Sequence, residues 1–214
     1  MKLYTFFRSS AAFRVRIALN LKGLQYESVP KAFARNEHRT PDYLALNPHG
    51  LIPALATDGV VLSQSLAIIE YLDERHPAPP LLPDDPIDRA RVRSMALTIA
   101  CEIHPLNNLR VLNYLRDMFE QDEDGVSTWY RHWITTGFAG LETQARELST
   151  AGRYCFGDAV SLADVLLVPQ MFNARRFKTD LAPFPTLVGI STHLEALPAF
   201  AAARPEVQPD AQSG

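Results

Sequence analysis

The stretch KLYTFFRSSAAFRVRIALNLKG, residues 2–23, decides the fold of the first part of this chain. Residues 2–7 are mainly β-branched and aromatic, which predicts a strand. Over residues 11–22 apolar side chains recur at a spacing of four, which predicts a helix with an apolar stripe. Ser9 and Ser10 stand where such a helix needs an N-cap. A strand that turns directly into a helix is therefore expected at the start of the chain.

The residues that follow extend this strand and helix into a small α/β domain. They predict a strand at 26–29, a short helix from Thr40, strands at 53–56 and 60–62, and a helix from Ser65 that ends before Pro77. The two later strands flank an Asp-Gly pair, which is a strong hairpin signal. A βαβ unit followed by an antiparallel hairpin gives a mixed sheet with helices packed on it.

A change in composition marks the domain boundary. Residues 77–86 hold five prolines, which is typical of a stiff connector. Beyond it, helical spacing recurs over residues 87–115, 127–148, 162–177 and 185–200. We therefore expect a first domain at 1–80 and an all-α helical bundle at 87–207. Pro105 predicts a kink in the first of these helices, and the polar tail 205–214 is expected to fray.

Composition and charge exclude several classes of function. The chain has 214 residues and a net charge of −3, so it has no bulk positive field for nucleic acid or an acidic membrane. Its two cysteines, Cys101 and Cys155, are too few for a disulfide framework or a zinc site of their own. The six histidines are scattered, so no metal is expected. No apolar run is long enough to span a bilayer, and a cytoplasmic protein is expected.

Polar residues at two predicted helix starts could bind an anion or stabilise a thiolate. Arg8-Ser9-Ser10 precedes the first helix, and Gln64-Ser65 begins the last helix of the first domain. Both places combine free backbone N–H groups with the positive end of a helix dipole. The alternative reading of each is a plain N-cap. Ile52-Pro53 lies just before a strand, and its base rate favours a trans bond.

The helical domain offers further polar candidates. His104 and Asn108 would share one helix face, whereas Arg110 would point elsewhere. Arg175 and Arg176 lie near a predicted helix end, where they could bind a carboxylate or simply stabilise the helix dipole. A solvated polar face is the alternative for the first group. The run 161–164, Ser-Leu-Ala-Asp, reads as a capping box and hence as folding chemistry.

The order of these motifs is more specific than any one of them. The resemblance rests on FRSSAAFRVRIAL (7–19), ALNP (45–48), IPAL (52–55), QSLAIIEYL (64–72), LLP (81–83), HPLNN (104–108), YCFGD (154–158), LVPQ (167–170) and RF (176–177). In this series the chain resembles the zeta-class glutathione transferases from residue 2 to about 209. That family includes maleylacetoacetate isomerases and bacterial maleylpyruvate isomerases.

The resemblance implies a thioredoxin-like first domain that binds glutathione and a helical domain that completes the substrate pocket. By this likeness, Ile52-Pro53 is a cis bond that offers its backbone to the cofactor, and Gln64 and Ser65 hold the γ-glutamyl end. Further glutathione contacts would be His38, His104 and Asn108. Ser9 is the expected activating hydroxyl, with Ser10 and the Ala11 backbone beside it. A homodimer is also implied.

One departure from the family pattern sharpens the expected mechanism. The family usually reads Ser-Ser-Cys where this chain has Ala11, and its first domain holds no thiol. The nucleophile must therefore be glutathione, which would add to a cis double bond, allow rotation and leave again. Arg8, Arg110 and Arg176 would bind the carboxylates of a maleyl dicarboxylate.

The expected function is thus glutathione-dependent isomerisation of maleylacetoacetate to fumarylacetoacetate, in the catabolism of aromatic amino acids. Maleylpyruvate isomerase is the first alternative, because the two substrates share the maleyl half. A glutathione transferase acting on haloacids or other electrophiles would use the same first-domain site but release a conjugate. An interaction protein without turnover would be expected to have a damaged glutathione site, yet Ser9, Pro53, Gln64 and Ser65 are all present.

Overall fold

The structure is a computed structural model that describes residues 1–213, and it divides into two compact units. The first unit joins Met1–Pro80 to the segment from Ala196 onward, and the second is Leu81–Glu195. The proline-rich connector thus contains the boundary. The sequence placed residues up to 207 in the helical domain, whereas the structure groups those after 195 with the first unit. Asn20 Nδ2 donates to the carbonyl of Ala199 at 2.9 Å, which helps to hold this segment on the first unit.

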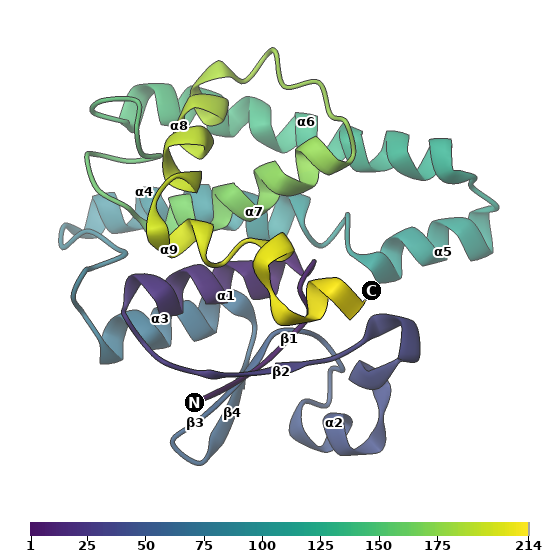
Figure 1. Cartoon of the computed structure of the whole chain (residues 1–214). Helices are drawn as coiled ribbons and strands as arrows, with labels where there is room; N and C mark the ends of the chain where they lie inside the picture. The colour runs from purple at the N-terminus through teal and green to yellow at the C-terminus, as the bar shows by residue number, and fades with distance from the viewer. Residues whose placement is uncertain (214) are drawn as a thin grey trace. The chain divides into compact units, whose positions relative to one another are not determined.

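The first unit is built on a four-stranded mixed sheet (Figure 1). Its order is β2-β1-β3-β4, with β1 at Lys2–Thr5, β2 at Glu27–Pro30, β3 at Ala54–Thr57 and β4 at Val60–Ser63. β1 pairs parallel to β2 and antiparallel to β3, and β3 and β4 form the antiparallel hairpin. The predicted thioredoxin-like topology is confirmed.

The helices of this unit are α1 (Ser10–Leu21), α2 (Pro41–Leu46), α3 (Ser65–Arg75) and α9 (Pro198–Ala201). Helix α1 is buried along its whole N-terminal part, including Arg14 and Arg16, which are 1% and 0% exposed. The expected single apolar stripe is therefore an incomplete description. α1 packs beside α3 on one side and against α9 on another, so almost no face of it is left for solvent (Figure 1).

The C-terminal tail is ordered, so the expected fraying is wrong for the residues that the structure describes. Short 3₁₀ turns form at Pro205–Val207 and Pro209–Ser213. Gln208 is buried, and its amide donates to the carbonyls of Ala202 and Arg204 at 3.0 and 2.9 Å. The last residue of the predicted tail, 214, lies outside the described residues.

The second unit is helical, as predicted. It comprises α4 (Pro86–Leu97), a π-helix at Thr98–Ile103, α5 (Leu109–Phe119), α6 (Glu123–Leu148), α7 (Leu162–Arg176) and α8 (Pro185–Glu195). The helix expected over 87–115 is broken by a turn that contains Pro105, which agrees with the predicted kink but is larger. Within the described part of the chain, no helix is both long and apolar enough to cross a membrane.

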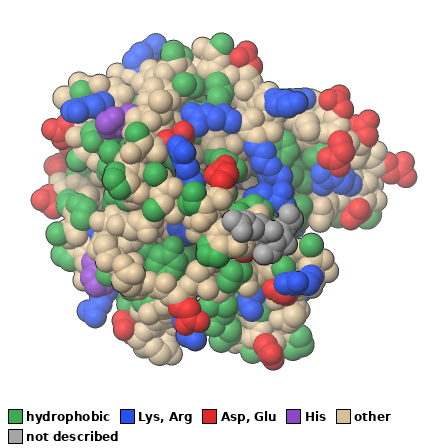
Figure 2. Space-filling model, viewed as in Figure 1, with side chains coloured by type: hydrophobic (Ala, Val, Ile, Leu, Met, Phe, Trp, Pro, Cys, Tyr) green, Lys and Arg blue, Asp and Glu red, His purple; other side chains and the backbone are tan. Residues whose placement is uncertain are grey.

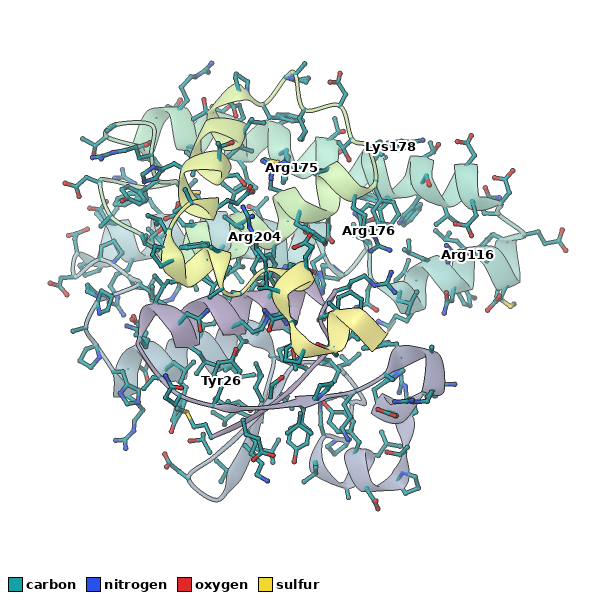
Figure 3. The ribbon with its side chains drawn as sticks, in the orientation of Figure 1. Tyr26, Arg116, Arg175, Arg176, Lys178 and Arg204 are labelled. Carbon is teal, nitrogen blue, oxygen red and sulfur yellow. The ribbon has the colours of Figure 1, made fainter. Side chains whose placement is uncertain are left out.

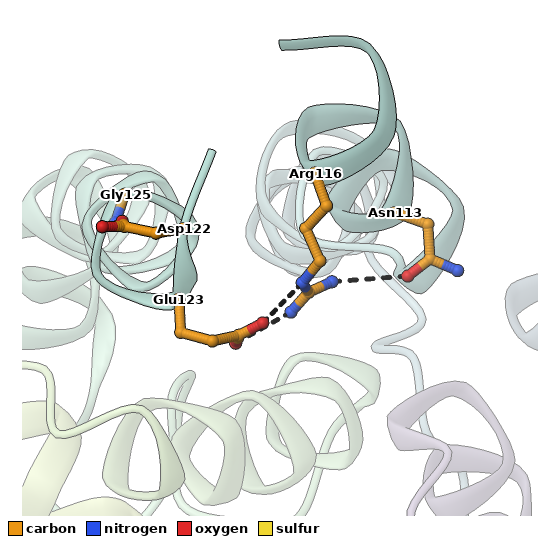
Figure 4. A network of polar contacts seen from close by, with 5 residues as sticks. All are labelled: Asn113, Arg116, Asp122, Glu123 and Gly125. Atoms are coloured by element: carbon orange, nitrogen blue, oxygen red, sulfur yellow. Dashed lines mark hydrogen bonds and ion pairs between the residues drawn. The ribbon is translucent and has the colours of Figure 1, made fainter. Parts of the chain in front are cut away.

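Charged side chains tie the turn between α5 and α6 together (Figure 4). Arg116 donates to both carboxylate oxygens of Glu123, at 2.7 and 3.0 Å, and also to Asn113 at 3.3 Å. Asp122 caps α6 by accepting from the N–H of Gly125 at 2.8 Å. Hydrogen bonding to Arg116 lowers the pKa of Glu123, although that carboxylate is exposed. Basic and acidic side chains are both spread over the visible face of the molecule (Figure 2).

Candidate active site

The turn between β1 and α1 presents a hydroxyl group at a helix N-terminus. The N–H of Ser9 closes the turn onto the carbonyl of Phe6 at 3.0 Å, and Ser9 is the N-cap of α1. Its Oγ accepts from the N–H of Ala12 at 3.2 Å, which leaves the hydroxyl hydrogen available to a ligand. The first N–H groups of a helix have no partner within the helix. A negatively charged atom placed beside Ser9 would meet both kinds of donor.

Exposure distinguishes Ser9 from its neighbours. Ser9 is half-buried, whereas Ser10 and Ala11 are 7% and 9% exposed. Of the two hydroxyls, that of Ser9 is therefore the more open to a bound molecule. Arg8 is exposed, and its guanidinium lies 5.1 Å from the ring centre of Phe7 and 5.7 Å from that of Phe6. Two cation–π contacts keep the charge of Arg8 close to the turn.

The loop before β3 packs against this turn. The Ile52–Pro53 bond is cis, as the family resemblance implied and against the base rate for such bonds. The loop is fixed through the carbonyl of Leu51, which accepts from the Tyr43 hydroxyl at 2.7 Å and the Asn47 amide at 2.8 Å. Ile52 belongs to one buried cluster with Ala12, Tyr43 and Ala54. The cluster brings the loop against the first turn of α1.

A strained residue precedes α3. Gln64 has φ 69° and ψ 117°, a backbone conformation that residues other than glycine rarely adopt. Its side chain is exposed. Such a backbone costs about 1–3 kcal/mol and is concentrated at functional sites. The next residue, Ser65, is buried at the helix N-terminus and accepts from Arg14 Nη1 at 3.3 Å. This bond ties the start of α3 to α1.

His38 carries a buried polar atom with no partner. It lies in a 3₁₀ turn, Glu37–Arg39, and its ring stacks on Phe33 at 4.2 Å between centres. Within residues 1–213, its Nδ1 is buried without a hydrogen bond. Burial, with a smaller contribution from Arg39, lowers the pKa of His38. Phe33 itself packs on the cluster of Ala12 and Ile52.

In the first unit, Ile52 belongs to one buried cluster, and the Ser9 turn and His38 border it through Phe6 and Phe33. The predicted residues of this unit supply hydrogen-bond donors at two helix N-termini, an exposed amide and an imidazole with an unused nitrogen. Glutathione carries two carboxylates, a thiol and amide groups, and this set of donors fits it. The residues that would hold it are Ser9, Ser10, Ala11, His38, Ile52, Pro53, Gln64 and Ser65.

In the second unit, His104 and Asn108 lie on other elements than the sequence predicts. His104 and Asn108 do not share a helix face, because His104 ends the π-helix and Asn108 begins α5. Asn108 Oδ1 accepts from the N–H of Arg110 at 3.1 Å, which is an N-cap. Its Nδ2 and the exposed Arg110 guanidinium keep their ligand roles as predictions.

Basic side chains gather at the end of α7, where Arg175, Arg176 and Lys178 are labelled in Figure 3. Arg175 is ion-paired with Glu195. The guanidinium of Arg176 lies 5.2 Å from the ring centre of Phe177. Arg175 is therefore engaged within the second unit. The role of Arg176 at a substrate carboxylate stays a prediction.

Sequence reasoning missed three residues that hold the site together. Arg14 and Arg16 lie inside an apolar helical run, and Asp210 lies in the tail. Arg14 bonds to Ser65, and Arg16 and Asp210 both bond to the turn that carries Ser9. The available signal was the pair of arginines within FRVRIAL, which is an unusual place for charges in a helix that packs on a sheet.

Comparison with known proteins identifies the family. Residues 1–74 match the model of the glutathione S-transferase N-terminal domain. The chain is 52% identical to a probable maleylacetoacetate isomerase of Vibrio cholerae, over 98% of this chain and 97% of that protein. It is 47% identical to a solved maleylpyruvate isomerase described as a bacterial zeta-class glutathione transferase, with TM-score 0.96 over 98% and 99% of the two chains. The chain belongs to the zeta-class glutathione transferase family.

A second solved relative carries ligands. The maleylacetoacetate isomerase of Methylobacterium extorquens AM1, solved with bound malonate and glutathione, is 44% identical to this chain. The two agree with a TM-score of 0.93, over 98% of each chain.

This zeta-class chain has its two thiols in the second unit. Cys101 is exposed, and Cys155 is buried. Burial, assisted by the charge of Asp164, raises the pKa of Cys155 well above its ordinary value, which disfavours its thiolate form. Ala11, at the start of α1, carries no thiol. The first unit therefore supplies no nucleophilic sulfur beside Ser9.

Proposed function

We propose that this enzyme catalyses the glutathione-dependent cis–trans isomerisation of maleylacetoacetate to fumarylacetoacetate. The observation that carries the proposal is the half-buried Ser9 at the N-terminus of α1, where the first unit has no thiol of its own. The name of the 52% identical Vibrio cholerae relative supports the choice of substrate. Maleylpyruvate is the alternative, supported by the name of the 47% identical relative from Ralstonia.

Bound glutathione supplies a thiolate that adds reversibly to the double bond of the substrate. Ser9 donates a hydrogen bond to the position of the sulfur, and the N-terminus of α1 favours negative charge there. His38 and Gln64 donate to polar groups of the tripeptide, and the N-terminus of α3 at Ser65 holds a carboxylate. These groups are fixed before the reaction, so they stabilise charge without having to reorganise.

Three arginines recognise the substrate in this proposal. A maleyl dicarboxylate has two negative charges, and guanidinium groups bind carboxylates through paired hydrogen bonds. Arg8 is held beside Ser9 by Phe6 and Phe7, which places a positive charge next to the activating hydroxyl. Arg110 and Arg176 act from the second unit, with His104 and Asn108 as additional contacts to glutathione. We also propose that the enzyme is cytoplasmic and forms a homodimer.

The test is an absorbance assay of the purified chain with maleylacetoacetate and with maleylpyruvate, each with and without glutathione. We expect glutathione-dependent loss of the cis substrate with no conjugate formed, and faster with maleylacetoacetate. A faster reaction with maleylpyruvate would make maleylpyruvate the preferred substrate and contradict the choice of maleylacetoacetate. Glutathione binding without either reaction would contradict the isomerase and indicate a transferase for haloacids or other electrophiles.

Replacing Arg176 with Lys tests the carboxylate clamp. Lysine keeps the charge but loses the paired geometry, so we expect about 1.5–3 kcal/mol less binding of the transition state. In steady-state kinetics this is a fall in kcat/KM, mostly through KM for the dicarboxylate. Arg175→Lys is the matched control, because Arg175 is paired with Glu195 and should have little effect. Unchanged kinetics in Arg176→Lys would remove Arg176 from the proposal.

A further inference from the structure

Both backbone groups of Phe7 are held by residues outside the turn that carries Ser9. The N–H of Phe7 donates to Asp210 Oδ2 at 2.8 Å, across 203 positions in the sequence. Its carbonyl accepts from Arg16 Nη2 at 3.0 Å. Phe7 lies between Phe6 and Arg8 in the turn that the Ser9 N–H closes. The path of the chain into Ser9 is therefore fixed from two sides.

Arg16, which holds the carbonyl of Phe7, also bonds to the C-terminal segment that carries Asp210. Its side chain is 0% exposed, and besides Phe7 it donates to Thr5 Oγ1 at 3.1 Å and to the carbonyl of Ala203 at 3.0 Å. Burial lowers the pKa of Arg16 to about 10, while Tyr26 and Asp210 act in the opposite direction. The guanidinium thus joins the end of β1, the turn and the C-terminal segment with three hydrogen bonds.

The segment that carries Asp210 is itself built to stay in place. Gln208 donates to two carbonyls of the preceding turn, and its own carbonyl accepts from the N–H of Ala211 at 3.0 Å. The second carboxylate oxygen of Asp210, Oδ1, is buried and has no partner within residues 1–213. Burying a carboxylate oxygen in this way costs free energy. A contact that served only to hold the end of the chain in place would not require a buried carboxylate oxygen without a partner.

We propose that Asp210 is a positioning residue for the reaction, and that it acts by holding the Phe7 N–H so that the Ser9 hydroxyl and the N-terminus of α1 meet the thiol of bound glutathione. The inference rests on the proposed function of Ser9. It assigns a role in thiol activation to the C-terminal segment, which lies about as far from Ser9 in the sequence as the chain allows. Small displacements of a group that stabilises developing charge cost large factors in rate.

The experiment compares full-length Asp210→Ala and Asp210→Asn with the unaltered chain. Asparagine keeps an acceptor for the Phe7 N–H, whereas alanine removes it. We expect Asp210→Ala to lower kcat by roughly tenfold or more, with little change in the Kd of glutathione. The ultraviolet titration of bound glutathione should show a higher thiol pKa in that variant. Asp210→Asn should recover most of both losses. Glu206→Ala, an exposed carboxylate of the same segment, is the matched control.

Hydrogen exchange supplies a readout that does not depend on activity. The Phe7 amide should exchange faster in Asp210→Ala than in the unaltered chain or in Glu206→Ala. Unchanged exchange at Phe7 would overturn the proposal, and so would faster exchange with normal kcat and thiol pKa. If the unaltered chain fails to bind glutathione, the proposed function is wrong and the inferred role of Asp210 falls with it. Glutathione binding by the unaltered chain, measured by calorimetry, therefore separates the two failures.

Discussion

Replacing Ser9 with Ala is expected to lower kcat/KM of the isomerisation by about 10²-fold, while glutathione still binds. The magnitude is that of losing one fixed hydrogen-bond donor to a developing or full negative charge. Without the Ser9 hydroxyl the thiol pKa of bound glutathione rises, so the thiolate fraction at neutral pH falls. The remaining activity should therefore increase with pH over a higher range than in the unaltered enzyme. Steady-state rates as a function of pH measure both effects.

The variant must be separated from a folding defect, because Ser9 also caps α1. Loss of a serine N-cap to alanine costs about 1 kcal/mol of stability, whereas glycine at an N-cap costs only a few tenths. Ser9→Gly removes the same hydroxyl at a smaller cost, and both variants should show the same kinetic loss. Ser10→Ala is the matched control, since Ser10 is buried at 7% exposure. A larger loss in Ser10→Ala than in Ser9→Ala would transfer the activating role to Ser10.

The local architecture of the first unit was predictable because its signals are local. The pair Asp58-Gly59 adopts positive φ at both residues, 48° and 79°, which is what the two-residue hairpin turn requires. The strand, turn and helix of residues 2–23 likewise follow from spacing and capping alone. Each of these elements is decided by side chains within a few positions of one another.

The burial of α1 and the order of the tail could not be predicted from such signals. One of the hydrogen bonds of Arg16 goes to the carbonyl of Ala203, which is 187 positions away. A charged residue in an apolar helix reads as an exposed one until its partner is known. The polar, proline-containing composition of residues 205–213 likewise says nothing about Phe7, whose N–H gives Asp210 its place.

The candidate site was predictable in its chemistry and less so in its geometry. Ser9 and Ser65 were predicted as candidates because each carries a hydroxyl at the start of a predicted helix. The structure places both at helix N-termini. The unusual φ of Gln64 has no sequence signal. Neither has the Nδ1 of His38, which lacks a hydrogen bond within residues 1–213. Asn108 shows the reverse case, because its predicted helix face does not exist and its side-chain Oδ1 caps α5 instead.

The second large effect concerns folding. Asp164, which is 0% exposed, accepts three hydrogen bonds of 2.7 Å, from the N–H of Cys155 and from the N–H and hydroxyl of Ser161. The capping box predicted from residues 161–164 is confirmed. Burial raises the pKa of Asp164, and the hydrogen bonds from Cys155 and Ser161 oppose that rise. The carboxylate therefore fixes both the start of α7 and the loop before it.

Asp164→Ala is expected to destabilise the protein by about 3 kcal/mol or more, because buried donors lose their acceptor. For a chain of this length that corresponds to a fall in the thermal unfolding midpoint on the order of 10 °C. Asp164→Asn keeps one acceptor oxygen, so its unfolding midpoint should lie between those of the unaltered chain and Asp164→Ala. Asp158→Ala, an exposed carboxylate of the same loop, should leave the midpoint unchanged. Since Asp164 acts through folding alone, the folded fraction of Asp164→Ala should keep its kcat, and a lower kcat with an unchanged midpoint would contradict this assignment.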